Sequence, residues 1–156
     1  MSRKPRTKPK QARRIQAPEE KAFLHLLRTA ESLMGGVAAV LKPAGLSPAQ
    51  YNVLRILRGA GPAGLACREI GARMVTRDPD ITRLIDRLER RRLITRSRDR
   101  KDRRIITIRI SEAGLELVNS LDEPVAGLHR RQLGHLGEQR LRRLTALLEA
   151  ARSRIQ

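Results

Sequence analysis

The hydrophobic pattern changes its period in the middle of the chain. Around residues 81–88 the apolar side chains follow the i, i+3, i+4, i+7 spacing of one helix face. They are Ile81, Leu84, Ile85 and Leu88. From Ile106 to Ile110 apolar and polar residues alternate, which is typical of a half-buried strand. The pattern therefore predicts a helix over about 78–91, followed at once by a hairpin over about 94–110.

Two shorter helices are predicted ahead of this unit. The first begins with Ser47 as N-cap, Pro48 in the first turn and Gln50 positioned to close a capping box. The second spans about 67–74, where Ala66 is a poor cap but Glu69 can serve the free backbone donors.

The next helix is expected to start with Asp78 as its N-cap, Pro79 in the first position and Asp80 in the first turn. A tight turn over 75–77 joins it to the preceding short helix. This arrangement predicts a helix-turn-helix, and the hairpin after it makes a winged helix-turn-helix.

A long apolar stripe precedes the helix-turn-helix and is ended by Pro43 and Gly45. Its members are Phe23, Leu26, Leu27, Ala30, Leu33, Met34, Val37 and Leu41. They predict one helix within 17–44 that is longer than a small core requires. We therefore expect it to offer a surface to a partner, most simply a second copy of the chain. Gly35 and Gly36 predict close packing or a bend in its middle.

The segment 112–156 is predicted to be helical as well. Pro124 should kink or restart the first of its helices, because proline removes a backbone donor. Gly134 and Gly137 break the next stretch, and leucines at helical spacing mark a terminal amphipathic helix. The fold class is thus mainly α with a small β-hairpin wing: a winged helix-turn-helix over 45–111 plus flanking helices.

Charge narrows the possible partners. The 156 residues contain 34 Lys and Arg against 16 Asp and Glu, a formal net charge of +18. This favours nucleic acid or an anionic membrane surface, with a solvated basic surface as the alternative. No apolar run reaches the length of a membrane span, and no signal-peptide hydrophobic segment follows the basic N-terminus, so we expect a cytoplasmic protein.

Residues 1–16 hold seven Lys or Arg and two Pro. Such a segment cannot bury enough apolar surface to offset its ordering entropy, so we expect a disordered basic tail. Two roles stay open for it: contact with phosphates or a minor groove, and solubilisation.

The expected DNA-facing surface of the helix over 78–91 lies opposite its apolar face. It carries Pro79, Thr82, Arg83, Arg87 and Arg90. Arg83 is the candidate base reader, because a guanidinium can bind guanine O6 and N7 together. Thr82 suits a thymine methyl or a phosphate, whereas Arg87 and Arg90 suit phosphates. The alternative is an ordinary solvated helix surface.

Acidic residues within this basic region are expected to orient arginines. Asp86 would do so for Arg83, for Arg90 or for an arginine of the hairpin. At the hairpin tip, Asp102 would brace one of the basic residues, which are candidates for phosphate or minor-groove contacts. Those basic residues are Arg100, Lys101, Arg103 and Arg104.

Over about residues 23–150 the sequence resembles the MarR (multiple antibiotic resistance regulator) family of bacterial transcription regulators. Three pieces carry the resemblance: LSPAQYNVL at 46–54, TRLIDRLE at 82–89, and DRR at 102–104 followed by ISEAG at 110–114. The last looks like the family's wing motif, which implies that Arg104 is the wing arginine that contacts DNA.

Two residues depart from the family pattern. Arg92 stands where the family usually has glycine before the apolar pair that follows the recognition helix, so we expect the helix exit to differ, with an added phosphate contact. Ser111 replaces the commoner threonine. The resemblance also implies that 17–44 and 112–156 form a dimerisation domain, and that a small, often aromatic or phenolic effector lowers DNA affinity.

These observations predict a sequence-specific, double-stranded DNA-binding transcriptional regulator. We expect a homodimeric repressor on a pseudo-palindromic operator that a small effector releases. The alternative is a non-specific, architectural DNA-binding protein. An enzyme is not expected, because the sequence shows no paired acids, nucleophile elbow or phosphate loop. We expect no metal and no cofactor, since His25, His129 and His135 lack acids or cysteines at ligand spacing. Cys67 has no second cysteine to pair with in the chain, and both a packed thiol and a redox role stay open.

Overall fold

The computed structural model describes residues 17–76, 80–98 and 106–154. The chain divides into two compact units, Met1–Ser32 and Leu33–Gln156, and the long helix α1 (Pro18–Leu41) crosses the boundary between them. In the first unit α1 carries exposed apolar side chains at Phe23, Leu26 and Leu27.

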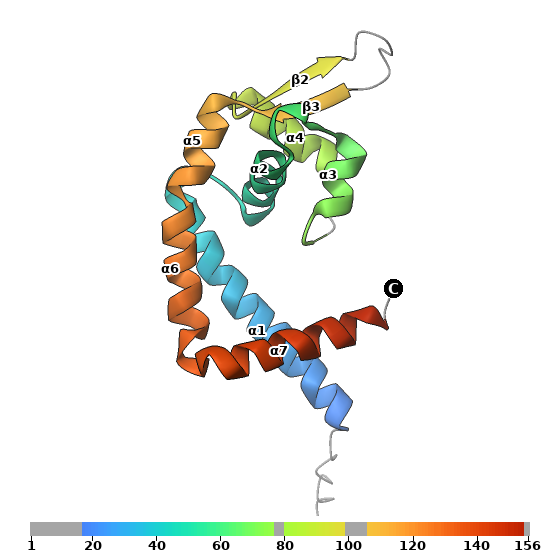
Figure 1. The fold of residues 1–156 in the computed structure, drawn as a ribbon, viewed down its shortest axis with the longest axis vertical. Coiled ribbons are helices and arrows are strands. Elements are labelled where there is room, and N and C mark those ends of the chain that lie inside the picture. The colour runs from blue at the N-terminus through green and yellow to red at the C-terminus, as the bar shows by residue number, and fades with distance from the viewer. Residues whose placement is uncertain (1–16, 77–79, 99–105, 155–156) are drawn as a thin grey trace, which may run out of the picture. The chain divides into compact units, whose positions relative to one another are not determined.

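The second unit confirms the predicted fold class, which is mainly helical with a small antiparallel sheet (Figure 1). Its α-helices after α1 are α2 (Pro48–Ala60), α3 (Cys67–Arg73), α4 (Ile81–Arg90), α5 (Glu112–Ser120), α6 (Asp122–Leu133) and α7 (Gly137–Ser153). Its strands are β1 (Leu65–Ala66), β2 (Ile94–Arg98) and β3 (Ile106–Ile110). Short 3-10 turns span Lys42–Ala44, Gly61–Ala63 and Gly134–Leu136.

Helix α2 begins as predicted. Ser47 Oγ accepts from the Gln50 N–H at 3.2 Å, and Gln50 Oε1 accepts from the Ser47 N–H at 2.9 Å, which completes the capping box. Helix α3 begins with Glu69 accepting from the Ala66 N–H at 2.8 Å, also as expected. Side-chain acceptors therefore satisfy the first donors of both helices.

The sheet contains a strand that the hydrophobic pattern did not predict. The order is β1-β3-β2, and β1 pairs with β3 through Leu65 opposite Ile108. Two residues are too short to show an alternating pattern. Gly64 makes the pairing possible: its φ is +68°, and a Cβ there would lie 2.5 Å from the Ile108 carbonyl oxygen.

Helix α4 starts later than predicted. Its N-cap is Asp80, whose carboxylate accepts from the Arg83 N–H at 3.4 Å, and its first residue is Ile81. The prediction of Asp78 as N-cap was therefore wrong. Both aspartates satisfy the composition rule for a cap, and the structure gives this role to Asp80, whose carboxylate reaches the N–H group three residues ahead. Pro79 lies outside the described residues.

The exit of α4 corrects a second prediction. Arg92 adopts φ +59°, its N–H donates to the Glu89 carbonyl at 2.7 Å, and the Leu93 N–H donates to the Leu88 carbonyl at 3.1 Å. This is the Schellman motif, which a glycine usually makes. The expectation of a different backbone exit was wrong, because arginine takes up the left-handed conformation itself despite its Cβ. The added phosphate contact stays a prediction.

Ser111 and Gly114 join the sheet to α5. The Ser111 N–H donates to the Leu93 carbonyl at 3.0 Å, its hydroxyl donates to the Arg92 carbonyl at 2.7 Å, and its Oγ accepts from the Gly114 N–H at 3.0 Å. A Cβ at Gly114 would lie 2.1 Å from the Leu93 carbonyl oxygen. The first turn of α5 therefore packs directly on the backbone that follows α4.

An ion pair connects α2 to the junction of α5 and α6. Arg58 donates to Asp122 Oδ2 at 2.7 Å and Oδ1 at 3.0 Å, and also to Asn119 Oδ1 at 2.8 Å. The Arg58 guanidinium lowers the pKa of the Asp122 carboxyl, chiefly through the hydrogen bond. Because the carboxyl pKa is lowered, the pair stabilises the fold fully when the pH is above the ordinary pKa of an aspartate. This contribution is lost as the pH falls through the lowered pKa.

Apolar packing completes the second unit. The core is almost wholly aliphatic, and Tyr51 is its aromatic member. Pro124 lies in the first turn of α6, which confirms the predicted restart.

Gly36 lets α6 approach α1, since a Cβ there would lie 2.4 Å from the Gln132 amide nitrogen. Cys67 is half-buried against the core. Among the described helices none is both long and apolar enough to span a membrane.

We predict that Gly114→Ala lowers the free energy of unfolding by about 1–3 kcal/mol, the usual cost of overpacking against groups that cannot move aside. Urea unfolding measures the change. The matched control is Gly59→Ala in α2, where an added Cβ meets nothing within 4 Å and should stabilise by up to about 1 kcal/mol. Equal unfolding midpoints for the two variants would contradict the packing of α5 on Leu93.

Candidate nucleic-acid interface

The exposed face of α4 carries the predicted contact residues that fall in the described part of the chain. Leu84, Ile85 and Leu88 point into the core, as the spacing predicted. The opposite face is polar. Its exposed residues are Thr82, Arg83, Arg87 and Arg90. Four of the predicted side chains therefore lie together on one solvent-facing surface, and their contact with DNA stays a prediction.

Arg83 is paired within its own helix. Its Nε lies 3.0 Å from Asp80 Oδ2, and its side chain is 77% exposed. Exposed ion pairs of this kind contribute about 0–1 kcal/mol. Arg83 is therefore oriented at the start of α4 but can turn toward a base edge at little cost.

Asp86 is paired with an arginine of the hairpin, one of the three partners considered for it. Arg96 of β2 donates to Asp86 Oδ1, and its Nε lies 3.3 Å from Glu89 Oε2. The Nε forms no well-aligned hydrogen bond there, so the contact with Glu89 is an ion pair only. Arg90 instead donates to the Asp86 backbone carbonyl at 3.4 Å. The acid in the middle of the basic face is thus neutralised by the hairpin, which lies beside α4 (Figure 1).

A second arginine fixes the base of the hairpin. Arg109 of β3 donates from Nε to the Pro62 carbonyl at 2.8 Å and from Nη1 to Ser97 Oγ. Arg98, the last residue of β2, is exposed at the side that leads to the hairpin tip. The two arginines therefore serve different ends: Arg109 holds backbone, and Arg98 faces solvent.

Several predicted site residues lie outside the described residues. They are Pro79, Arg100, Lys101, Arg103 and Arg104, together with Asp102 and the segment 1–16. The assignment of Arg104 as the wing arginine is therefore still a prediction.

The structure also shows a positioning residue that the pattern analysis did not identify. Asn52 of α2 accepts a hydrogen bond from the Val75 N–H at 2.9 Å, and so holds the turn between α3 and α4. A signal was present in the sequence, because asparagine is a poor helix former and stands in the middle of an otherwise well-formed helix.

A cavity of about 250 Å³ within the second unit is lined in part by Asn52 and Val75. Its polar side chains include Asn52, Arg55 and His129, and the Arg55 guanidinium lies 5.8 Å from the centre of the Tyr51 ring. Burial raises the pKa of the Tyr51 hydroxyl, which is therefore neutral near pH 7. Apolar walls are formed by Met34, Val37, Pro48, Ala49, Val75 and Val125, and Thr76 also lines the cavity.

The cavity thus combines an apolar interior with one cation and a few hydrogen-bonding groups, as small-molecule sites do. Among the described residues, no group of three or more His, Cys, Asp or Glu is placed to hold a metal ion. The cavity reaches Val75 and Thr76, which lie in the chain between α3 and α4.

Comparison with known proteins gives a consistent result. The sequence model of the MarR family matches residues 46–106. A MarR transcription factor of known structure from Planctomyces limnophilus is 40% identical, with 88% of this chain and 99% of that chain covered and a TM-score of 0.68. CouR from Rhodococcus jostii, solved bound to p-coumaroyl-CoA, is 28% identical over 87% of this chain and 94% of its own, with a TM-score of 0.73. The regulator MhqR of Bacillus subtilis is 27% identical over 83% of this chain and 88% of its own length.

We predict that Asp86 and Arg96 are energetically coupled. Asp86→Asn, Arg96→Gln and the double variant form a thermodynamic cycle, read by urea unfolding. Because both side chains are partly exposed, we expect a coupling of only about 0.5–1 kcal/mol. Additive effects, with a coupling near zero, would show that the hairpin is not held to α4 through this pair.

Proposed function

This chain belongs to the MarR family of transcriptional regulators, and on that premise we propose that it is a sequence-specific double-stranded DNA-binding repressor that a small effector releases. The observation that carries the proposal is the polar face of α4. Arg83, Arg87 and Arg90 are exposed there, while the charge of Asp86 is neutralised by Arg96. The face therefore presents positive charge and bidentate donors in the way that major-groove recognition requires.

We propose that the functional form is a homodimer. Exposed apolar side chains occur on α1 at Phe23, Leu26 and Leu27, and on α7 at Leu144, Leu147 and Leu148. Contiguous exposed apolar residues on helices favour a protein partner, and a second copy is the simplest one. Two recognition helices in one dimer would contact half-sites roughly 10 bp apart, which makes the expected operator a pseudo-palindrome.

The effector site that we propose is the cavity beside Asn52. A carboxylate or phenolate would pair with Arg55, and an aromatic ring would fit the apolar walls near Tyr51. Since Asn52 holds Val75 and both line the cavity, a ligand there would contact the turn that precedes α4. To act as an inducer, the ligand must bind the geometry that is unable to bind DNA more tightly than the DNA-binding one.

The net charge of +18 supports a second candidate function, non-specific architectural DNA binding. The two functions differ in what they require of α4. An architectural protein needs only phosphate contacts, whereas a repressor needs base contacts at fixed positions.

Selection of bound sequences from a random DNA pool tests the proposal directly. The repressor function predicts enrichment of one pseudo-palindrome within a few rounds at physiological salt. Recovery of unrelated sequences would leave the architectural function and overturn the proposed one.

We predict that Arg83→Ala weakens binding to the selected operator by about 1–3 kcal/mol and relaxes the base preference at one position in each half-site. Fluorescence anisotropy with operator variants measures both. The matched control is Arg87→Ala, which should weaken all sequences alike and reduce the salt slope by about one. If Arg83→Ala behaves like this control, then Arg83 contacts phosphate and the base-reading assignment is wrong.

We predict that Arg55→Ala raises the concentration of a hydroxybenzoate needed to release DNA by about tenfold, the effect of losing one charge-assisted contact of about 1.4 kcal/mol. DNA affinity without the ligand should stay unchanged. Arg131→Ala, an exposed position on α6, is the control. Identical release curves for Arg55→Ala and the control would place the effector elsewhere.

A further inference from the structure

A pair of hydrogen bonds ties the C-terminal end of the recognition helix to the corner between α1 and α2. Arg91, the C-cap of α4, donates from Nη1 to the Gly45 carbonyl at 2.6 Å and from Nη2 to the Ala44 carbonyl at 2.9 Å. The two donors of one guanidinium thus serve two successive carbonyls. This fork depends on the planar geometry of arginine, which lysine does not have.

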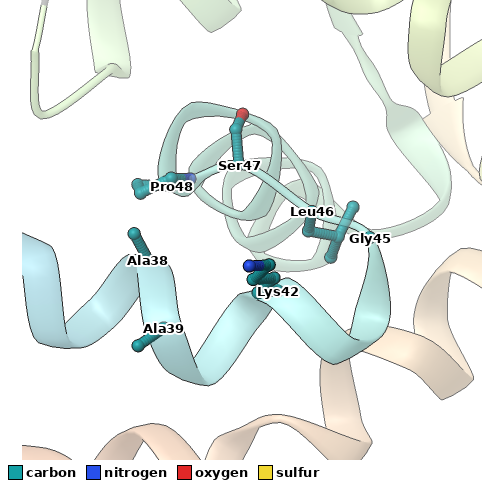
Figure 2. A pocket seen from close by; sticks show the side chains of 7 residues that line it. All are labelled: Ala38, Ala39, Lys42, Gly45, Leu46, Ser47 and Pro48. Carbon is teal, nitrogen blue, oxygen red and sulfur yellow. The ribbon is translucent and has the colours of Figure 1, made fainter.

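The corner that Arg91 grips is itself firmly built. Gly45 has φ +63° and donates to the Lys42 carbonyl at 2.9 Å, and the Leu46 N–H donates to the Leu41 carbonyl at 3.3 Å. Leu41 is 0% exposed and Leu46 is 4% exposed, so the corner is anchored on the core from both sides. Figure 2 shows the corner at Gly45 and Leu46, next to an open hollow that is also lined by Ala38 and Ala39 of α1 and by Lys42 of the following 3-10 turn.

The neighbours of Arg91 are arranged differently. Arg90 donates to a carbonyl of its own helix, and Arg92 lies in the Schellman turn with an exposed side chain. Among the described contacts of these three arginines, Arg91 is the one whose side chain hydrogen-bonds to another part of the fold, 46 and 47 residues away in sequence. Three adjacent arginines at the end of a recognition helix suggest phosphate binding. The hydrogen bonds of Arg91 to the Ala44 and Gly45 carbonyls indicate another role for this residue.

We propose that Arg91 is a positioning residue for DNA recognition: it sets the orientation of α4 against the α1–α2 corner and does not bind phosphate. The inference rests on the proposed DNA-binding function. If Arg91 has this role, the end of α1 can change the position of the recognition helix, as the turn at Val75 can. A shift of the corner would be transmitted to α4 through two backbone carbonyls.

Arg91→Lys separates this role from a phosphate contact. Lysine keeps the positive charge but has a single ammonium in place of the planar guanidinium. A phosphate contact would therefore largely survive, whereas the pair of hydrogen bonds to the Ala44 and Gly45 carbonyls, here called the clamp, would be lost. We expect Arg91→Lys to bind the selected operator about tenfold more weakly, with random-duplex affinity and the salt slope unchanged. Arg131→Lys, at an exposed position on α6 away from the polar face of α4, is the control and should bind like the wild type.

A second measurement does not depend on DNA. Spin labels at Ala39→Cys and Arg87→Cys, both exposed in the parent chain, are introduced in a Cys67→Ser background and diluted with unlabelled protein. Pulsed electron paramagnetic resonance then measures the distance between the labels on α1 and α4. Arg91→Lys should broaden the distance distribution, whereas Arg131→Lys should leave it narrow. Thermal unfolding checks that both variants are folded at the measuring temperature.

The outcomes are distinguishable. If the wild-type protein shows no preference for any DNA sequence, the proposed function is overturned. The distance distribution between the spin labels still tests whether Arg91 holds α4 to the corner. An unchanged distribution in Arg91→Lys overturns the clamp. Operator binding by Arg91→Lys at the wild-type level, with a salt slope that falls by about one in Arg91→Gln, would assign Arg91 to a phosphate and overturn the proposal.

Discussion

The recognition helix is held in place by arginines that do not belong to its outward face. Arg96 reaches it from β2 through Asp86 and Glu89, and Arg91 fastens its end to the carbonyls of Ala44 and Gly45. Each guanidinium provides several donors in a fixed plane, so a single side chain restrains a helix in more than one direction. A base-reading side chain needs such restraint, because its contacts depend on where the whole helix lies.

Arginines paired within the second unit also offset part of its positive charge. Many like charges destabilise a fold through repulsion. Several arginines are therefore used inside the structure, where Arg58 pairs with Asp122 and Arg109 with the backbone of Pro62. The remaining cations on α4 stay in solvent. A positive charge near a DNA-binding helix is thus a poor guide to which residues contact DNA. The atoms to which each guanidinium is already bonded are a better guide.

Much of the fold follows from the sequence because local rules and the hydrophobic pattern agree. The Ser47 cap, the apolar face of α4 and the restart at Pro124 were all predicted. The strand at Leu65 and the true N-cap at Asp80 were not, since a two-residue strand has no period and two aspartates compete as caps. The roles of Asn52 and Arg91 depend on backbone groups distant in sequence, which no local pattern reveals. The exit at Arg92 was expected to differ because the resembled family usually has glycine there, whereas the surrounding hydrogen bonds hold arginine in the same left-handed conformation.

The central claim is that α4 reads bases and does not merely attract phosphates. The most direct test is a competition at physiological salt between a pseudo-palindrome obtained by selection and random duplex of equal length. A repressor of this kind should prefer the palindrome by at least about 10³-fold. Equal competition by the two duplexes would contradict the account and leave charge as the only basis of binding.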